Sequence, residues 1–262
     1  MLNILVCIKQ VPDTTDVKID PKTGTLIREG VPSIVNPDDK HALEEALRMK
    51  EKFGGKVTVL SMGPPQAEDA LRECSAMGAD EMVLLCDRAF AGADTWATSY
   101  TLGEAAKKIG YDLIICGREA IDGDTAQIGP QMAEHLLLPQ ITYVRKAEVK
   151  GKTILCERAL EDGYERIEAP LPALITVIAD LNKPRYPSVR GIVEAYREKK
   201  VTVWTAKDIC ADGTCIGLDG SPTSVKRSFA PEPKGKGEVL KGNAKEMSKQ
   251  LVAKLKDKNV LR

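Results

Sequence analysis

Short apolar runs alternate with amphipathic segments through the first 140 residues of the chain. The apolar runs show no polar alternation, which predicts strands that are buried on both faces. Because parallel neighbours need crossover connections, strands that alternate with helices predict an α/β fold with a doubly wound, mainly parallel sheet. The expected strands cover residues 3–8, 56–63, 81–86 and 112–117, and the expected helices cover 36–53, 65–77, 94–109 and 125–137.

The first of these helices carries the clearest start and stop signals. Asn36 is expected to cap it, and Pro37 suits its first turn. Gly54 and Gly55 are expected to end it. Ligands of parallel α/β sheets bind beyond the carboxyl ends of the strands, so the segments that follow the strands are the candidates for function.

From Ile141 the pattern changes to β-rich hairpins. Strands are expected in ITYVRKAEV and KTILCERAL, with turns at Lys150-Gly151 and near Asp162-Gly163, before LPALITVIA. The core is expected to end near Ala179. The polar stretch DLNKPRYPSVRG that follows holds two prolines and predicts an exposed loop.

The last 56 residues look different from the rest of the chain. From Lys207 onward there are twelve Lys or Arg against seven Asp or Glu, and apolar residues recur at helical spacing only at Met247, Leu251 and Leu255. Such a segment is expected to lack a core of its own and to form an arm. The expected architecture is a domain of residues 1–180 with an antiparallel hairpin extension, a loop with a following helix or strand at 181–206, and a C-terminal arm at 207–262.

Charge and targeting signals narrow the classes of partner. The 38 basic and 38 acidic residues cancel, so the chain as a whole gives no electrostatic reason to expect nucleic acid or a membrane surface as its partner. The first apolar run is too short for a signal sequence, and no later run approaches the length of a membrane span. A cytoplasmic protein is expected. Its seven scattered cysteines form no CxxC pair, and reduced thiols are expected.

Several familiar chemistries do not fit the sequence. His41 and His135 are the only histidines, and Cys210 and Cys215 are too few and wrongly spaced, so no metal site is expected. No GxGxxG follows a strand, which argues against the usual dinucleotide fingerprint. The tripeptide GKT at 151–153 is better explained as a hairpin turn, because Lys146 stands where a phosphate loop needs glycine.

Two strand-to-helix junctions share a plan, GADTWATS at 92–99 and DGDTAQ at 122–127. In each, an Asp is positioned to cap and a Thr is expected in the first helical turn, where exposed N–H groups and the hydroxyl donate to phosphate oxygens. Gly123 leaves room for close backbone approach. Ordinary helix caps without a ligand remain the alternative for each junction taken alone. Together the junctions favour a nucleotide, bound where five segments should converge: 7–10, 36–39, 61–65, 92–98 and 118–127.

Longer motifs resemble the β subunit of an electron-transferring flavoprotein: AIDGDTAQIGPQ, VNPDD, ADLNKPRYPSVRGIVEA, and Arg158 with Glu161-Asp162-Gly163, Glu165 and PALIT. The resemblance covers nearly the whole chain. It implies a heterodimer with an α subunit that holds one FAD, while the β subunit holds a structural AMP or a second FAD. In that case residues 1–180 are the nucleotide-binding domain and the arm lies on the α subunit. Carried onto this sequence, the nucleotide site comprises Cys7, Asn36, Asp39, Met62, Asp122, Asp124, Ala126, Gln127 and Ile128.

The resemblance favours the members that bind FAD in this subunit. Members with AMP resemble AIDDDCNQTGQ, whereas Gly123, Thr125, Ala126 and Ile128 are smaller or less polar. FAD-type members place residues like those of the two junctions beside the pyrophosphate and ribityl groups. This adds to the site Asp94, Thr95, Thr98, Arg118, Gly123 and Thr125.

FAD-type members oxidise NADH and bifurcate its electrons, in anaerobic metabolism. One electron goes to ferredoxin or flavodoxin, and the other passes through the α-subunit FAD to a flavin dehydrogenase such as an acyl-CoA dehydrogenase. No side chain is expected to be catalytic, because the flavin carries the chemistry. A docking loop is implied at 184–191, with Val189 as the apolar anchor; its candidate contacts are Pro184, Arg185, Tyr186 and Val189.

Two alternatives stay open. The first is a non-bifurcating electron carrier that holds AMP in this subunit. The second is a nucleotide-binding regulatory domain without a redox role, because fold and nucleotide site alone do not imply electron transfer.

Overall fold

The computed structural model describes residues 1–13, 32–226, 235 and 237–261. These residues fall into two compact units, the first of which ends at Lys226. The second unit contains the C-terminal helix. Each unit is described separately below.

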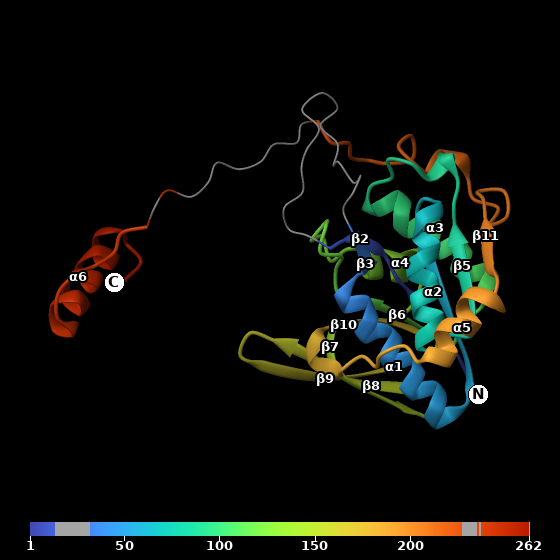
Figure 1. The fold of residues 1–262 in the computed structure, drawn as a ribbon, viewed down its shortest axis with the longest axis horizontal. Coiled ribbons are helices and arrows are strands. Elements are labelled where there is room, and N and C mark those ends of the chain that lie inside the picture. Colours follow the sequence, from blue (N-terminus) through green and yellow to red (C-terminus); the bar gives the residue numbers. More distant parts are fainter. Residues whose placement is uncertain (14–31, 227–234, 236, 262) are drawn as a thin grey trace. The chain divides into compact units, whose positions relative to one another are not determined.

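A nine-stranded sheet forms the centre of the first unit (Figure 1). Its strand order is β11-β5-β4-β1-β6-β10-β7-β8-β9, and all pairs from β11 to β7 are parallel. The predicted doubly wound, mainly parallel sheet is confirmed. The strands are β1 (Leu2–Cys7), β4 (Gly55–Met62), β5 (Glu81–Leu85), β6 (Leu113–Gly117), β7 (Gln140–Lys150), β8 (Thr153–Leu160), β9 (Gly163–Pro170), β10 (Ala173–Val177) and β11 (Val201–Trp204).

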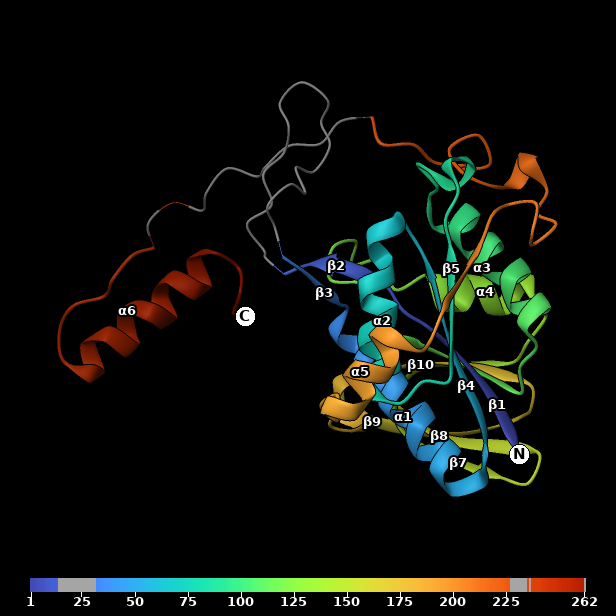
Figure 2. The same ribbon diagram turned by 45° about the vertical axis from the view of Figure 1, so that its right-hand side comes forward.

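Helices cover both faces of the parallel part of the sheet (Figures 1 and 2). Successive residues of β1 are apolar and point to opposite faces of the sheet, so both faces need cover. Ile4 and Val6 lie in the core beneath α1 and α2, whereas Leu5 and Cys7 lie in the core beneath α3 and α4. The first face is covered by α1 (Pro37–Phe53) and α2 (Glu68–Met77), with α5 (Val189–Arg197) against α2, and the second by α3 (Thr95–Ile109) and α4 (Ile128–His135).

Short elements complete the first unit. Strands β2 (Gln10–Pro12) and β3 (Ser33–Val35) form a separate antiparallel pair. Single 3₁₀ turns lie at η1 (Pro65–Ala67), η2 (Arg88–Phe90), η3 (Ala179–Leu181) and η4 (Gly213–Cys215). The end of α1 at Gly54 is as predicted, and the left-handed φ of 67° at that glycine is the reason the helix stops there.

The hairpin extension is confirmed, with one difference. Strands β7, β8 and β9 are antiparallel neighbours, but β9 was not predicted because its residues are mostly exposed and polar. The run ALITV, which was expected to follow the hairpins, returns to the parallel sheet as β10 between β6 and β7. All five of its residues are buried, which is typical of a strand covered on both faces.

The expected arm begins later than predicted. Residues 207–226 belong to the first unit, and Ile209 and Ile216 are buried in the core that includes α3 and α4. The hydroxyl of Ser221 accepts from the backbone of Asp94, and Thr223 donates to its carboxylate. The prediction that the chain lacks a core from Lys207 onward is therefore wrong for this stretch, because two isolated apolar residues are enough to hold it on an existing core.

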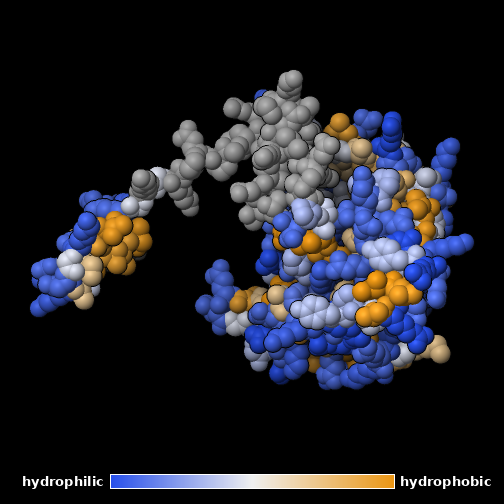
Figure 3. Space-filling model, in the orientation of Figure 1, coloured by the Kyte–Doolittle hydropathy of each residue, from blue (hydrophilic) through white to orange (hydrophobic). Residues whose placement is uncertain are grey.

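The second unit contains α6 (Ala244–Asp257), which begins with a capping box formed by Asn243 and Glu246. None of its residues is buried, and Leu251 and Val252 contribute to an apolar surface on the helix (Figure 3). Across the described ranges no helix has both the length and the apolar character needed to cross a membrane.

Candidate functional site

Four neighbouring parallel strands end at the same edge of the sheet. Strands β5, β4, β1 and β6 end at Leu85, Met62, Cys7 and Gly117. The segments that follow them therefore meet at this carboxyl edge, where α/β proteins bind their ligands.

Asp39 ties two of these strand ends together. Its buried carboxylate accepts from the backbone N–H of Lys9 at 2.8 Å and of Gly117 at 3.2 Å. A side chain at position 117 would overlap this carboxylate, so only glycine fits there. Burial raises the pKa of Asp39 to about 7, and the hydrogen bonds oppose that rise. Asp39 thus acts as a structural support for the edge.

Asn36 holds the loop that follows β6. It stands at the start of α1 as predicted, but its side chain makes no capping bond. Its amide instead donates to the carbonyl of Glu119 at 2.8 Å and accepts from the N–H of Ile121 at 3.1 Å. The prediction of a side-chain cap is therefore wrong, since this side chain is used to fix a distant segment.

The loop of residues 118–127 does not start a helix where the sequence suggested. Asp124 and Ala126 have left-handed φ values of 47° and 52°, and α4 starts only at Ile128. Thr125 is therefore outside the first helical turn, and Asp124 is not the cap residue. Left-handed backbone in residues other than glycine is uncommon and clusters at functional sites.

The start of α4 is set by packing rather than by a cap. Gly129 lies so close to Thr176 of β10 that a side chain there would collide with it. Gln127 stands at the N-cap position without making a side-chain capping bond. Among the described residues, no side chain caps the first N–H groups of α4, those of Ile128 and Gly129.

The start of α3 is capped as predicted. Asp94 accepts from the N–H of Ala97 at 3.1 Å, and its second oxygen accepts from Thr223. The hydroxyl of Thr95 donates to the side chain of Gln127 at 3.1 Å, which joins the two junctions that share a sequence plan.

Charge at the edge is partly paired. The ammonium of Lys9 lies 2.7 Å from the carboxylate of Asp122, which offsets the negative charge that would repel an anion. Arg118 pairs with Asp38 at 3.5 Å and with Glu119. Residues 121–125 are exposed, and a side chain added at Gly123 would meet nothing within 4 Å.

The remaining predicted site residues differ in their burial and in their bonds at the edge. Cys7 is buried, with its thiol donating to the sulfur of Met132 at 3.8 Å, so it lies beneath the edge. Met62, Thr98 and Ile128 are half-buried. The others are held by two sets of bonds. Lys9 joins Asp39 to Asp122, next to the Ile121 N–H that bonds Asn36, and Thr95 bonds Gln127 separately.

Four further residues at this edge were not named from the sequence, although Lys9 and Ser61 lie in the segments 7–10 and 61–65 that were expected to converge here. Lys9 follows the first strand directly and Gly117 ends the fourth one, so their positions at strand ends were the available signal. Gly129 gave no signal, because its role depends on Thr176 far along the chain. Ser61, near the end of β4, has a buried hydroxyl with no hydrogen-bond partner among the described residues.

The candidate docking residues lie on one short segment that ends at Val189, the first residue of α5. Tyr186 and Val189 are 94% and 82% exposed, which is unusual for large apolar side chains. Arg185, in contrast, points to α1 and pairs with Glu44 at 2.8 Å. Pro184 is half-buried beside it.

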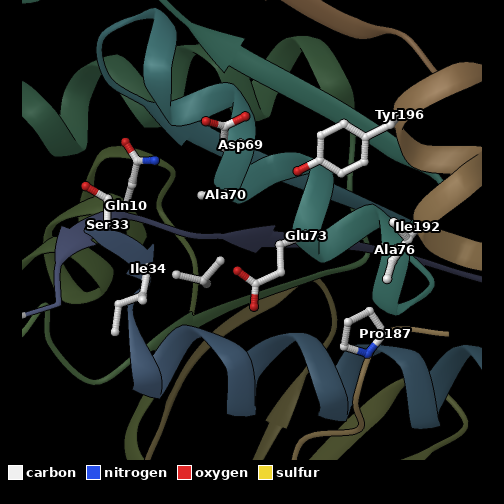
Figure 4. A pocket seen from close by; sticks show the side chains of 11 residues that line it. Gln10, Ser33, Ile34, Asp69, Ala70, Glu73, Ala76, Pro187, Ile192 and Tyr196 are labelled. Carbon is white, nitrogen blue, oxygen red and sulfur yellow. The ribbon is translucent and has the colours of Figure 1, made fainter. Parts of the chain in front are cut away.

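A cavity of about 500 Å³ lies on the α1 and α2 side of the molecule (Figure 4). Asp69 and Glu73 of α2 face Pro187 and Tyr196 across it, and β2 and β3 close another side. Glu73 is paired with Lys40 at 2.7 Å. The docking segment therefore forms one wall of this cavity through Pro187.

A doubly wound sheet with polar loops gathered at its carboxyl edge is the architecture of α/β proteins that bind a ligand there. Comparison with known proteins defines the class further. The family model of the electron transfer flavoprotein domain matches residues 23–209.

Individual relatives match over nearly the full chain. The electron transfer flavoprotein subunit beta of Thermoanaerobacterium thermosaccharolyticum is 60% identical over 99% of this chain and 100% of its own. The subunit of the same name from Clostridium acetobutylicum is 58% identical over the same shares. Subunit CarD of the caffeyl-CoA reductase-Etf complex of Acetobacterium woodii is 56% identical, again over 99% and 100%.

The chain belongs to the electron transfer flavoprotein family, as a β subunit. Its role is electron transfer in a heterodimer with an α subunit. The resemblance noted in the sequence is thereby confirmed, and the alternative of a regulatory domain without a redox role is wrong.

Proposed function

We propose that this chain is the β subunit of a bifurcating electron transfer flavoprotein. It binds FAD at the carboxyl edge and accepts hydride from NADH. Electrons then pass to ferredoxin or flavodoxin and, through the FAD of the α subunit, to a flavin dehydrogenase such as an acyl-CoA dehydrogenase. The similarity to a subunit of a caffeyl-CoA reductase-Etf complex supports a dehydrogenase partner of this kind.

The observation that carries the proposal is the uncapped start of α4 beside an open loop. N–H groups at a helix start favour phosphate, and in the described part of the chain no side chain caps those of α4. The unpartnered hydroxyl of Ser61 adds a polar group at the same edge. The residues at the edge thus fit the pyrophosphate and ribose of a nucleotide.

The space at Gly123 favours FAD over AMP. Both nucleotides present phosphate and ribose, so the helix start alone does not distinguish them. A side chain at Gly123 would project into open space, and its absence leaves room for the larger cofactor. Exposure of residues 121–125 leaves this side of the edge accessible to NADH.

The side chains have binding and positioning roles in this proposal. Bound flavin supplies the hydride acceptance and the single-electron transfer. Asn36 and Asp39 hold the loop and the strand ends, and Gln127 and Thr95 orient the two helix starts toward the cofactor. The ammonium of Lys9 compensates the carboxylate of Asp122 beside the phosphates.

Coupled electron transfer tests the proposal. The purified heterodimer is mixed anaerobically with NADH, ferredoxin and the flavin dehydrogenase. We expect ferredoxin to be reduced only when the dehydrogenase has its own electron acceptor. Oxidation of NADH without ferredoxin reduction would contradict bifurcation, and no NADH oxidation at all would favour the AMP-binding alternative.

The C-terminal helix is proposed to bind the α subunit. In the second unit, Leu251 and Val252 remain about half exposed on a helix with a well-formed cap, as in an element that packs on another chain. Ending the chain after Lys226 is expected to abolish the heterodimer in size-exclusion chromatography while the first unit stays folded. A truncated chain that still co-elutes fully with the α subunit would contradict this assignment.

A further inference from the structure

The segment that carries Tyr186 and Val189 is held to the body of the protein by a buried carboxylate. The side chain of Glu44, on α1, is only 4% exposed. One of its oxygens accepts from the guanidinium of Arg185 at 2.8 Å and from the backbone N–H of the same residue at 3.1 Å. The carboxylate thus fixes both the main chain and the side chain of the segment.

The second oxygen of Glu44 is also occupied. It accepts from Arg48, one turn later on α1, at 2.7 Å. Burial favours the neutral form of Glu44, but the hydrogen bonds from Arg185 and Arg48 outweigh it and keep its pKa below the usual range. Glu44 is therefore a charged acceptor, and charge-assisted hydrogen bonds are stronger than neutral ones.

Further contacts fix both ends of the segment. At its start, the buried side chain of Asn182 donates to the carbonyl of His41 at 3.0 Å and to Glu45 at 3.2 Å. At its end, Gly191 lies so close to the carbonyl of Ala76 that a side chain there would collide with it. Between these points, Tyr186 and Val189 are the large apolar side chains that are exposed.

Buried ion pairs often add little to stability, because removing two charges from water costs about as much as the pairing returns. Their better attested effect is to select one conformation. A loop that already has its bound conformation loses less entropy when a partner docks, which raises affinity without any new contact. The pair of Glu44 and Arg185 therefore serves the geometry of the segment rather than the stability of the fold.

We propose that Glu44 is a positioning residue that holds residues 182–188 in the conformation in which Val189 is presented to the flavin dehydrogenase. This inference rests on the proposed electron delivery to a flavin dehydrogenase and on the docking role that the resemblance implies for Val189. Glu44 itself does not touch the dehydrogenase. Its carboxylate acts through Arg185, and the exposed residues make the contact.

Two measurements on the αβ heterodimer test the inference. The first is backbone hydrogen exchange in residues 183–191, which reports the order of the segment whatever its function. The second is the Michaelis constant for the dehydrogenase in electron delivery. In Glu44→Gln we expect exchange to become at least about ten-fold faster and the Michaelis constant to rise about ten-fold, at unchanged kcat.

Matched variants exclude a general loss of folding. Glu51 also pairs with Arg185 but is 58% exposed, so Glu51→Gln is expected to change both measurements less than about two-fold. Arg185→Gln leaves Glu44 paired with Arg48 and is expected to loosen the segment as Glu44→Gln does. NADH oxidation by an artificial acceptor should stay unchanged in Glu44→Gln, and the double variant should be no worse than either single one.

The outcomes separate the inference from the proposal beneath it. Unchanged exchange in both Glu44→Gln and Arg185→Gln would overturn the positioning role. Faster exchange with an unchanged Michaelis constant would also overturn it, provided that Val189→Asp raises that constant. If Val189→Asp leaves the constant unchanged as well, the docking role of the segment is wrong and the inference fails with it.

Discussion

The starts of α3 and α4 have similar sequences and different structures. GADT precedes α3 and GDT precedes the approach to α4, and each offers an Asp followed by a Thr. Asp94 caps α3 as that pattern predicts, whereas Asp124 adopts a left-handed conformation and α4 begins four residues later. One helix start has a side-chain cap, and the other has none among the described residues.

The difference between the two helix starts indicates which of them is available to a ligand. At α3 the carboxylate of Asp94 caps the N–H of Ala97 and also accepts from Thr223, so both of its oxygens are already in use. At α4 the backbone is held by Asn36 and by close packing at Gly129, and its first N–H groups are left for another partner. We therefore assign the phosphate contacts of the proposed cofactor to α4, with α3 in a supporting role through Thr95.

The largest effect is expected from a change at Asp39, whose carboxylate supports the carboxyl edge of the sheet. Asp39→Asn replaces one of two accepting oxygens by a donor, so the N–H of Lys9 or of Gly117 loses its partner, at a cost of about 1–3 kcal/mol. The thermal midpoint of the heterodimer measures this loss. Asp69→Asn, at an exposed position of α2, is the control and is expected to change the midpoint little.

The same variant has a predictable pH dependence. The folded-state pKa of Asp39 is raised to about 7 from 3.8, so the folded protein binds a proton that the unfolded chain releases in this range. The stability from this protonation is fully present below pH 3.8 and is lost as the pH rises through about 7. The gap between wild type and Asp39→Asn should therefore shrink from pH 4 to pH 7, and a gap that widens would contradict the raised pKa.

The next effect is expected on the cofactor alone. In Gly123→Asp the new carboxylate fills the open space and brings negative charge to the proposed pyrophosphate site, so FAD affinity of this subunit should fall at least ten-fold, or about 1.4 kcal/mol. NADH oxidation should fall with it, while the α-subunit FAD stays bound. Gly163→Asp is matched, since that glycine is equally open and lies on the hairpin. Equal losses in both variants would contradict the assignment.

A smaller effect distinguishes the two helix starts directly. Asp94→Ala removes a true cap and should destabilise the heterodimer by about 1 kcal/mol. Asp124→Ala removes no cap, and we expect less than about 0.5 kcal/mol. Chemical denaturation of the two variants side by side measures the difference, and equal losses would show that Asp124 has a structural role that its contacts do not reveal.

The smallest effect is expected from relieving the left-handed backbone before α4. Ala126→Gly removes the steric cost of a φ of 52°, while glycine adds entropy to the unfolded chain. These terms nearly cancel, so the denaturation midpoint should stay within about 0.5 kcal/mol of wild type. A large loss would mean that the methyl group of Ala126 makes a contact that the loop needs.

Much of the fold could be predicted, because buried strands and helices carry apolar patterns that are visible in a short stretch of sequence. Apolar runs such as ILVC in β1 and the glycine after α1 report their own environment. Strand β9 could not be predicted, because most of its residues are exposed and polar. Its strand conformation depends on pairing with a neighbouring strand of the sheet. The packing of Ile209 and Ile216 into the core also could not be predicted, because it depends on contacts with residues that are distant in the sequence.

Prediction of the site from the sequence has the same limit. The segments that converge at the carboxyl edge follow from strand order and could be predicted, as could the cap at Asp94. The hydrogen bonds of Asn36 could not, because they join residues more than eighty positions apart. Left-handed backbone at Asp124 and Ala126 was equally hidden, since neither residue requires it.

Cofactor content distinguishes FAD from AMP in this subunit without any change to the protein. The unmodified αβ heterodimer is purified without added nucleotide and denatured, and the released cofactors are identified and counted against protein. The account predicts two FAD per heterodimer and no AMP, with one FAD held at the start of α4. One FAD together with one AMP would contradict the bifurcating assignment, while the family membership of the chain would remain.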